Sequence, residues 1–189
     1  AEPPLPVRLR RMDEDRLRRY RENLDFYEGR QWAGRARRGE RRLTFNYGKA
    51  FADKITGYLL TGLSVQVEAR DGDTAAGRER ARAAERALRE VEAANGLAQL
   101  DYETELDCAV LGDGCYKVTW GAEEQQVRIT APDVQGIFAW RVPDDPSRLT
   151  AVASQYRLDD AEPAGTRSSP TLVTEYWTAG TFELWHGET

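Results

Sequence analysis

Apolar residues in the first part of the chain recur at helical spacing. The run from Asp13 to Gly29 has acidic residues in its first turn and a glycine at its end, as helices prefer. The apolar positions of this run are Leu17, Tyr20, Leu24 and Tyr27. Their spacing predicts an amphipathic helix. Three prolines among the first six residues predict an extended segment before it, because proline disfavours helix in the residue that precedes it.

A second helix is predicted after Asn46, which is a favourable N-cap residue. Apolar side chains then recur along one face of this helix, and we expect them to form a structural core. These positions are Tyr47, Phe51, Ile55, Tyr58 and Leu59. Gly62 is expected to end the helix. Residues 63–69 alternate apolar and polar positions, which is the period of a half-buried strand.

The second half of the chain changes from helical to strand periodicity. Residues 78–94 and 97–111 are predicted to form a pair of helices, and the second ends at a tight turn over residues 112–114. Alternating segments follow, and the first two are expected to pair as a hairpin. The predicted strands are residues 115–120, 126–131, 136–142, 149–158, 171–177 and 181–187. Helices followed by antiparallel strands predict an α+β fold with a β-meander.

Charge is unevenly distributed along the 189 residues, whose net charge is −5. Residues 1–54 hold 15 Lys or Arg against 9 Asp or Glu, whereas the remaining residues hold 12 against 23. The basic N-terminal part, residues 1–54, is expected to attract an anionic partner or an acidic surface of another subunit. We therefore expect an N-terminal arm over residues 1–45, made of the amphipathic helix and a basic loop, and an α+β domain over residues 46–189.

Composition also narrows the class of protein. No stretch approaches the roughly 18 uninterrupted apolar residues of a membrane helix, and residues 1–6 lack the pattern of a signal peptide. Neither a membrane span nor secretion is therefore expected. Two cysteines are too few for a disulfide framework, so a reducing compartment fits best.

Residue types that perform catalysis or bind metals lack the spacing that such sites need. A phosphate-binding loop of the GxxxxGK[ST] kind is absent from the sequence. Asp71 and Asp73 lack the later ligands of a calcium loop, which favours exposed turn acids over a metal site. Cys108 and Cys115 would need a nearby base to act as nucleophiles, and the one histidine, His186, lies at the far end of the chain. We expect no catalytic group, no metal and no cofactor.

A cluster of arginines in the basic loop is the best candidate for a contact site. Closely spaced guanidinium groups can neutralise phosphates and release counterions. The cluster consists of Arg35, Arg37, Arg38, Arg41 and Arg42. Only Trp32 and Phe45 flank it, so base stacking is not indicated. A solvated or subunit-contacting loop is favoured over a DNA contact, and both interpretations stay open.

The order of several loose motifs resembles the opening of phage portal proteins of the SPP1 type. The segment YRENLDFYEGRQW at 20–32 resembles that family's YY-x-G region. RLTFNYGKAFADKITGYLLTGLSVQVEA at 42–69 is similar to its N-Y-x-K-x-I-x-D-x-x-x-G-Y-L-x-G-x-P run. The matching positions are Asn46, Tyr47, Lys49, Asp53, Lys54, Gly57, Tyr58, Leu59 and Gly62. Phe51 stands where the family usually has an aliphatic residue, and Leu63-Ser64 replaces its common proline.

This resemblance implies a non-enzymatic subunit of a ring, commonly of twelve copies, at a capsid vertex. The chain would be the wing region, and the family's stem and clip would lie outside it, so a truncated chain is expected. Implied partners are other copies of the subunit, the large terminase subunit, capsid or scaffold protein, head completion proteins and viral double-stranded DNA. Implied locations are the virion and, during assembly, the host cytoplasm.

Two functions from other classes compete with this interpretation. A nucleic-acid-binding adaptor would use the basic segment 30–42 as its main site and would bind DNA with steep salt dependence. A hydrolase would lose turnover on replacement of Asp113 or Cys115. The sequence offers no nucleophile with an identifiable base for the second alternative.

Overall fold

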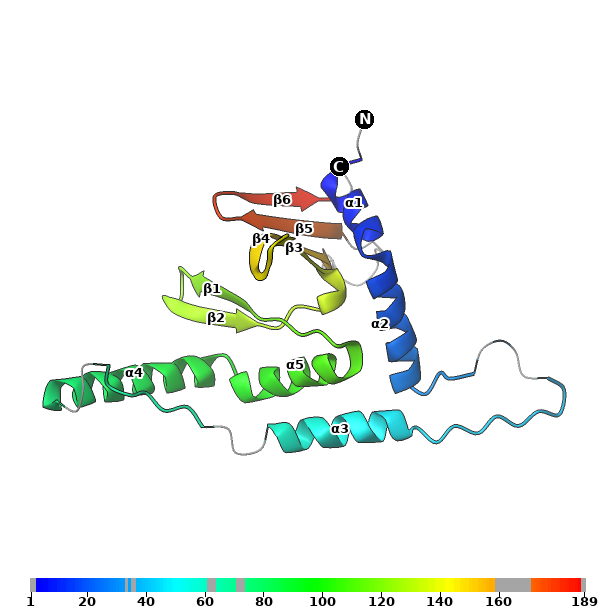
Figure 1. Cartoon of the computed structure of the whole chain (residues 1–189), viewed down its shortest axis with the longest axis horizontal. Coiled ribbons are helices and arrows are strands. Elements are labelled where there is room, and N and C mark those ends of the chain that lie inside the picture. Colours follow the sequence, from blue (N-terminus) through cyan, green and yellow to red (C-terminus); the bar gives the residue numbers. More distant parts are fainter. Residues whose placement is uncertain are drawn as a thin grey trace, which may run out of the picture. The chain divides into compact units, whose positions relative to one another are not determined.

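The computed structural model describes residues 3–32, 34, 37–60, 64–70, 74–158 and 171–187. The helices in chain order are α1 (Leu5–Met12), α2 (Glu14–Tyr27), α3 (Tyr47–Leu59), α4 (Ala75–Ala94), α5 (Leu97–Leu111) and the 3₁₀ helix η1 (Val134–Gly136). The strands are β1 (Lys117–Gly121), β2 (Gln126–Thr130), β3 (Ile137–Val142), β4 (Asp145–Leu158), β5 (Thr171–Thr178) and β6 (Phe182–His186). Helices precede antiparallel strands, as Figure 1 shows, so the predicted α+β class is confirmed.

The chain forms two compact units, and their division differs from the expected boundary after residue 45. The first unit combines residues 1–22 with residues 132–189, and the second comprises residues 23–131. Helix α1 and the start of α2, which belong to the expected arm, are therefore part of a folded unit with the C-terminal strands. Sequence distance concealed this arrangement, because the contacts that join the two ends span more than a hundred residues.

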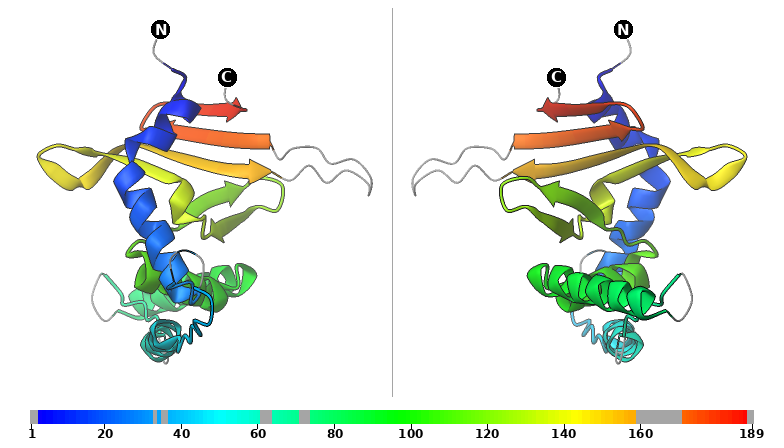
Figure 2. Two further views of the ribbon diagram at one scale, coloured as in Figure 1. Left: turned by 90° about the vertical axis from the view of Figure 1, so that its right-hand side faces the viewer. Right: turned by 90° about the vertical axis from the view of Figure 1, so that its left-hand side faces the viewer.

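The first unit consists of α1 and the start of α2 packed on a four-stranded antiparallel sheet of order β3-β4-β5-β6. Figure 2 shows α1 crossing this sheet. Leu9 of α1, Phe138 of β3 and Ala153 of β4 form its buried core. The predicted meander is confirmed, because β3 to β6 pair in sequence order.

Arg16 of α2 forms hydrogen bonds to the backbone of η1 and of the start of β3. Its guanidinium donates hydrogen bonds to the backbone oxygen of Ile137 at 2.7 Å and to that of Val134 at 3.3 Å. It also donates to Asp13 at 3.0 Å, and its carbon lies 5.7 Å from the centroid of the Phe138 ring. One partly buried cation thus ties α2 to the backbone at the start of β3.

Helix α1 occupies residues that the sequence predicts to be extended, so that prediction is wrong. Pro4 is its N-cap, with φ −60° and ψ 157°, and Pro6 lies in its first turn. The first N–H groups of a helix have no intrahelical acceptor, so a proline there loses no hydrogen bond. Packing of Leu9 against the sheet then stabilises a helix of only eight residues.

The second unit contains the end of α2, helices α3, α4 and α5, and the β1-β2 hairpin. Its helices lie where predicted, with α4 and α5 separated by Asn95 and Gly96 and with the left-handed Gly112 ending α5. The hairpin is confirmed, with Lys117 opposite Thr130. The Asn95 side chain joins it to the helices: it accepts from the Ile129 backbone N–H at 2.7 Å and donates to the Val127 carbonyl at 3.0 Å.

Residues 64–70 form no strand, which contradicts the strand predicted over 63–69. Alternation favours a strand only where a neighbouring strand supplies hydrogen bonds, and these residues pair with no strand in the described part of the chain. Gly62 and Leu63 lie outside the described residues; within the described range, α3 ends at Leu59. None of the described helices is long and apolar enough to span a bilayer.

Candidate subunit interface

Helix α3 exposes its large apolar side chains to solvent. The exposed fractions of Tyr47, Phe51, Ile55, Tyr58 and Leu59 are 65%, 64%, 52%, 70% and 56%. The prediction that they form a core within this chain is therefore wrong, and we call these five residues the α3 apolar face. The helix packs instead through its opposite side, where Thr56 is fully buried and α5 lies alongside (Figure 1). Periodicity shows which residues share a face but not what covers it.

Further exposed apolar side chains precede and follow helix α3 in the sequence. Leu43 and Phe45 precede the helix, and Val65 follows it; more than half of each is exposed. The Phe45 and Tyr47 rings stack with centroids 6.2 Å apart. Exposed apolar residues scattered singly are ordinary, whereas a group that shares one helix face, as these do on α3, marks an interaction site.

The second unit has a sparse core of its own. Among its described residues, Leu111 is the one buried hydrophobic side chain, at 8% exposed, whereas the first unit buries several. Most of the exposed large hydrophobic side chains belong to the second unit. A unit that buries little apolar surface internally gains stability when another surface covers the remainder.

Polar contacts between the end of α2 and the start of α3 fix the position of the α3 apolar face. The Tyr27 hydroxyl donates to Asp53 at 2.6 Å and accepts from the Lys49 ammonium at 2.6 Å. Asn46 caps α3 by accepting from the Lys49 backbone N–H at 3.1 Å, and its amide donates to the Tyr27 carbonyl at 2.7 Å. Lys49 and Asp53 of α3, together with its cap Asn46, therefore all form hydrogen bonds with Tyr27.

The same contacts shift two pKa values in one direction. Two effects raise the pKa of Tyr27: burial of the hydroxyl, which is the larger, and its hydrogen bond to Asp53. The hydrogen bond to Tyr27 raises the pKa of Lys49. Both shifts favour the protonated forms, so the cluster of Tyr27, Lys49 and Asp53 is complete at neutral pH.

The basic loop is partly folded on itself. Arg42 lies over the Trp32 ring, 5.6 Å from its centroid, and its Nε donates to Glu40 at 2.9 Å. Glu40 also accepts from the Arg37 backbone N–H at 2.6 Å. These bonds lower the pKa of Glu40, that of Arg42 being the larger cause. Arg42 thus serves the loop's own structure.

The other arginines of the predicted cluster differ in what the structure describes. The side chains of Arg37, Arg38 and Arg41 are exposed. Arg35 lies outside the described residues. The structure therefore leaves three guanidinium groups of the cluster facing solvent, where they can meet an anionic surface.

Comparison with protein families identifies the chain. Residues 8–162 match the family described as phage P22-like portal protein. The chain belongs to this family. The resemblance to phage portal proteins is thereby confirmed at that level, whereas assignment to the SPP1 type is not. No match is found among curated proteins.

Membership gives this portal chain a structural role. No group of three or more His, Cys, Asp or Glu in the described ranges is arranged to hold a metal ion. The pKa of the Cys108 thiol is raised, mainly by burial and to a lesser extent by the negative charges of Glu105, Asp107 and Asp113. A raised pKa disfavours the thiolate, which is the opposite of an activated nucleophile. Cys108 and Cys115 form no disulfide with each other.

The remaining candidate residues of the portal chain have ordinary settings. Asp71 and Asp73 lie outside the described residues. His186 is an exposed residue at the end of β6, and residues 112–114 form the predicted turn after α5. Asn46, Lys49 and Asp53 belonged to the portal-like sequence pattern, but only the structure relates them to Tyr27, because pairing across 26 positions leaves no periodic signal.

Proposed function

We propose that this portal chain is the wing part of a subunit that assembles side by side with its own copies into a ring. The ring would lie at the capsid vertex of the virion and form part of the conduit for DNA packaging and ejection and of the head–tail connector. The family match over residues 8–162 carries this proposal. Assembly would take place in the host cytoplasm.

A neighbouring copy would cover the α3 apolar face. The sparse core of the second unit supports this assignment, because burial against a neighbour would supply apolar contacts that the isolated unit lacks. Closed rings are built from one surface repeated against a different surface of the next subunit, so one exposed face per copy suffices. The large terminase subunit, capsid or scaffold protein and head completion proteins would contact the assembled ring.

Electrostatics supports a conduit that does not hold DNA tightly. Residues 55–189 carry 23 acidic against 12 basic side chains, and their negative field would repel a passing duplex. The exposed arginines of the basic loop would then contact a neighbouring subunit, the scaffold or DNA. DNA-binding measurements on a variant with Arg37, Arg38 and Arg41 replaced by Gln test this second role.

If the loop contacts phosphates, the slope of log affinity against log salt should become shallower by up to about 0.9 per arginine removed. A matched variant replaces three exposed arginines of α4 instead: Arg80, Arg82 and Arg86. Equal slopes for both variants would exclude a specific DNA role for the loop.

Electron microscopy of the purified portal protein that carries this sequence tests ring formation. Closed rings are expected, and Phe51→Asp should prevent them, because it places a charge in the centre of the α3 apolar face. Leu88→Asp on α4 is the matched control, since Leu88 is also an exposed apolar side chain. A protein that stays monomeric at every concentration, with capsid protein present or absent, would refute the proposal. Mass spectrometry of purified virions tests the location.

A further inference from the structure

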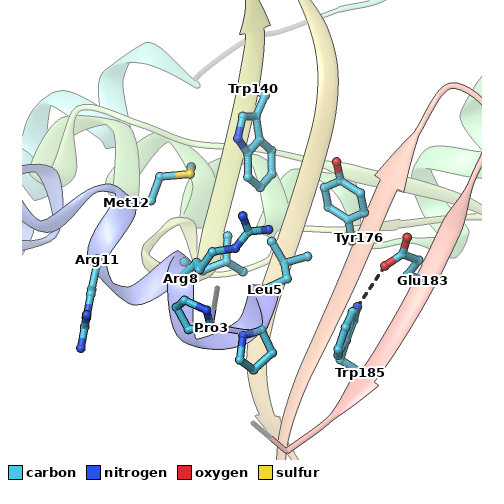
Figure 3. Close-up of a pocket in the computed structure, with 11 residues that line it drawn as sticks. Pro3, Leu5, Arg8, Arg11, Met12, Trp140, Tyr176, Glu183 and Trp185 are labelled. Atoms are coloured by element: carbon cyan, nitrogen blue, oxygen red, sulfur yellow. Dashed lines mark hydrogen bonds between the residues drawn. The ribbon is translucent and has the colours of Figure 1, made fainter. Parts of the chain in front are cut away.

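A groove of about 730 Å³ lies between α1 and one face of the four-stranded sheet in the first unit. Its volume falls within the range of about 300–1,000 Å³ that is usual for ligand pockets. Figure 3 shows the side chains that line it. We call it the α1 groove and define it by Leu5, Arg8 and Met12 on α1 and by Trp140, Tyr176 and Trp185 on the sheet.

Three strands supply an aromatic wall to the α1 groove. Trp140 lies on β3, Tyr176 on β5 and Trp185 on β6, and strand register places them on the sheet face that α1 covers. The Trp140 and Tyr176 rings meet edge to face, with centroids 5.5 Å apart. The Trp185 indole donates to Glu183 at 3.3 Å, which holds that ring in place. The wall is therefore an ordered surface for flat apolar groups.

Two donors on this wall have no hydrogen-bond partner in the described part of the chain. These are the indole N–H of Trp140 and the hydroxyl of Tyr176. A polyproline II segment exposes backbone carbonyls that make no internal hydrogen bonds. Aromatic grooves bind such segments because the rings contact prolyl rings while indole and phenol donors meet the carbonyls.

Two exposed prolines of the chain border the groove. Pro3 and Pro4 of the chain line it, and Pro4 has φ −60° and ψ 157°, within the polyproline II region. Among the described residues that line the groove, two are basic, Arg8 and Arg11, and one is acidic, Glu183, so these charges are predominantly positive. An acidic side chain on a ligand would therefore be attracted to the α1 side.

We propose that the α1 groove binds an extended, proline-containing acidic segment of a partner protein. Prolyl rings would pack on Trp140 and Trp185, ligand carbonyls would accept from Trp140 and Tyr176, and a ligand carboxylate would lie near Arg8 and Arg11. This binding site is additional to the α3 apolar face, which belongs to the second unit.

Peptide binding by the portal protein tests the proposal, with a labelled decapeptide of alternating proline and glutamate as the probe. Fluorescence anisotropy should show saturable binding, weaker for decaproline and weaker still for alternating proline and lysine. Tyr176→Phe keeps the ring and removes the donor, whereas Trp140→Phe removes the donor and replaces the indole by a smaller aromatic ring. Each should weaken binding about five- to tenfold. Trp120→Phe, at an exposed tryptophan of β1 outside the groove, should leave binding unchanged.

A further variant separates charge from shape. Arg11→Gln should weaken binding of the acidic peptide and leave decaproline binding unchanged. Absence of saturable binding, or equal affinity in the groove variants and Trp120→Phe, would overturn the proposal. Preferential binding of a single-stranded thymidine oligonucleotide would also overturn it, because stacking of bases would then explain the aromatic wall. None of these outcomes depends on ring assembly through α3.

Discussion

Replacement of Phe51 by Ala would separate the stability of the chain from its assembly. Phe51 is 64% exposed in the isolated chain. If a neighbour covers that part, roughly 130 Å² of the approximately 200 Å² typical of an aromatic side chain becomes buried on assembly. At about 25 cal/mol per Å², this area is worth about 3 kcal/mol, or on the order of a hundredfold in the dissociation constant of each contact.

The cost to folding of the isolated chain should be smaller. About 70 Å² of Phe51 is already covered, which is worth about 2 kcal/mol by the same coefficient. Alanine has a higher helix propensity than phenylalanine, which recovers roughly 0.5 kcal/mol at this helical position. We therefore expect a loss of about 1 to 2 kcal/mol in the free energy of unfolding.

Two measurements distinguish these effects. Sedimentation velocity over a concentration series gives the assembly equilibrium, and urea unfolding followed by circular dichroism gives the stability. Leu88→Ala, at a 43% exposed leucine on α4, should leave the assembly equilibrium unchanged. A variant that assembles normally but loses more than about 3 kcal/mol of stability would show that Phe51 belongs to the chain's own core, which would refute the reasoning.

Three further predictions concern stability. Asn95→Ala should lower the free energy of unfolding by about 1–3 kcal/mol, because the Val127 carbonyl and the Ile129 N–H lose their hydrogen-bond partner. Amide hydrogen exchange should become faster in β2, and unchanged protection there would contradict this prediction. Gly136→Ala should lower the free energy of unfolding by about 1–3 kcal/mol, because the new methyl group would overlap the Gln155 backbone carbonyl. Gly57→Ala is the comparison: its methyl group has open space, and the substitution should stabilise α3. Chemical unfolding measures the stability of both variants. Stability should fall as pH rises above about 10, because Tyr27 and Lys49 have raised folded-state pKa values and their contribution is lost on deprotonation. Urea titrations of Tyr27→Phe should show a smaller alkaline loss, and an equal loss would exclude this cluster as the cause.

Local sequence determined most elements of this protein. The Asn46 cap, the turn at Gly112 and the alternation in β1 to β6 act through neighbouring residues, so their signals are readable without the fold. The order of motifs was also sufficient to indicate a phage portal protein, as the match over residues 8–162 confirms. These local patterns are readable because the backbone N–H and C=O groups of each element must find hydrogen-bond partners, which restricts the residues at its caps and turns.

Tertiary structure decided which surfaces these elements cover. The period of α3 grouped Phe51 with its apolar neighbours, but only packing on α5 shows that this face is left exposed. Helix α1 forms where prolines suggested extension, because Leu9 is buried against the sheet. Residues 64–69 alternate without a strand to pair with. In each case the deciding free energy comes from burial or pairing between distant segments, which the sequence of one segment does not contain.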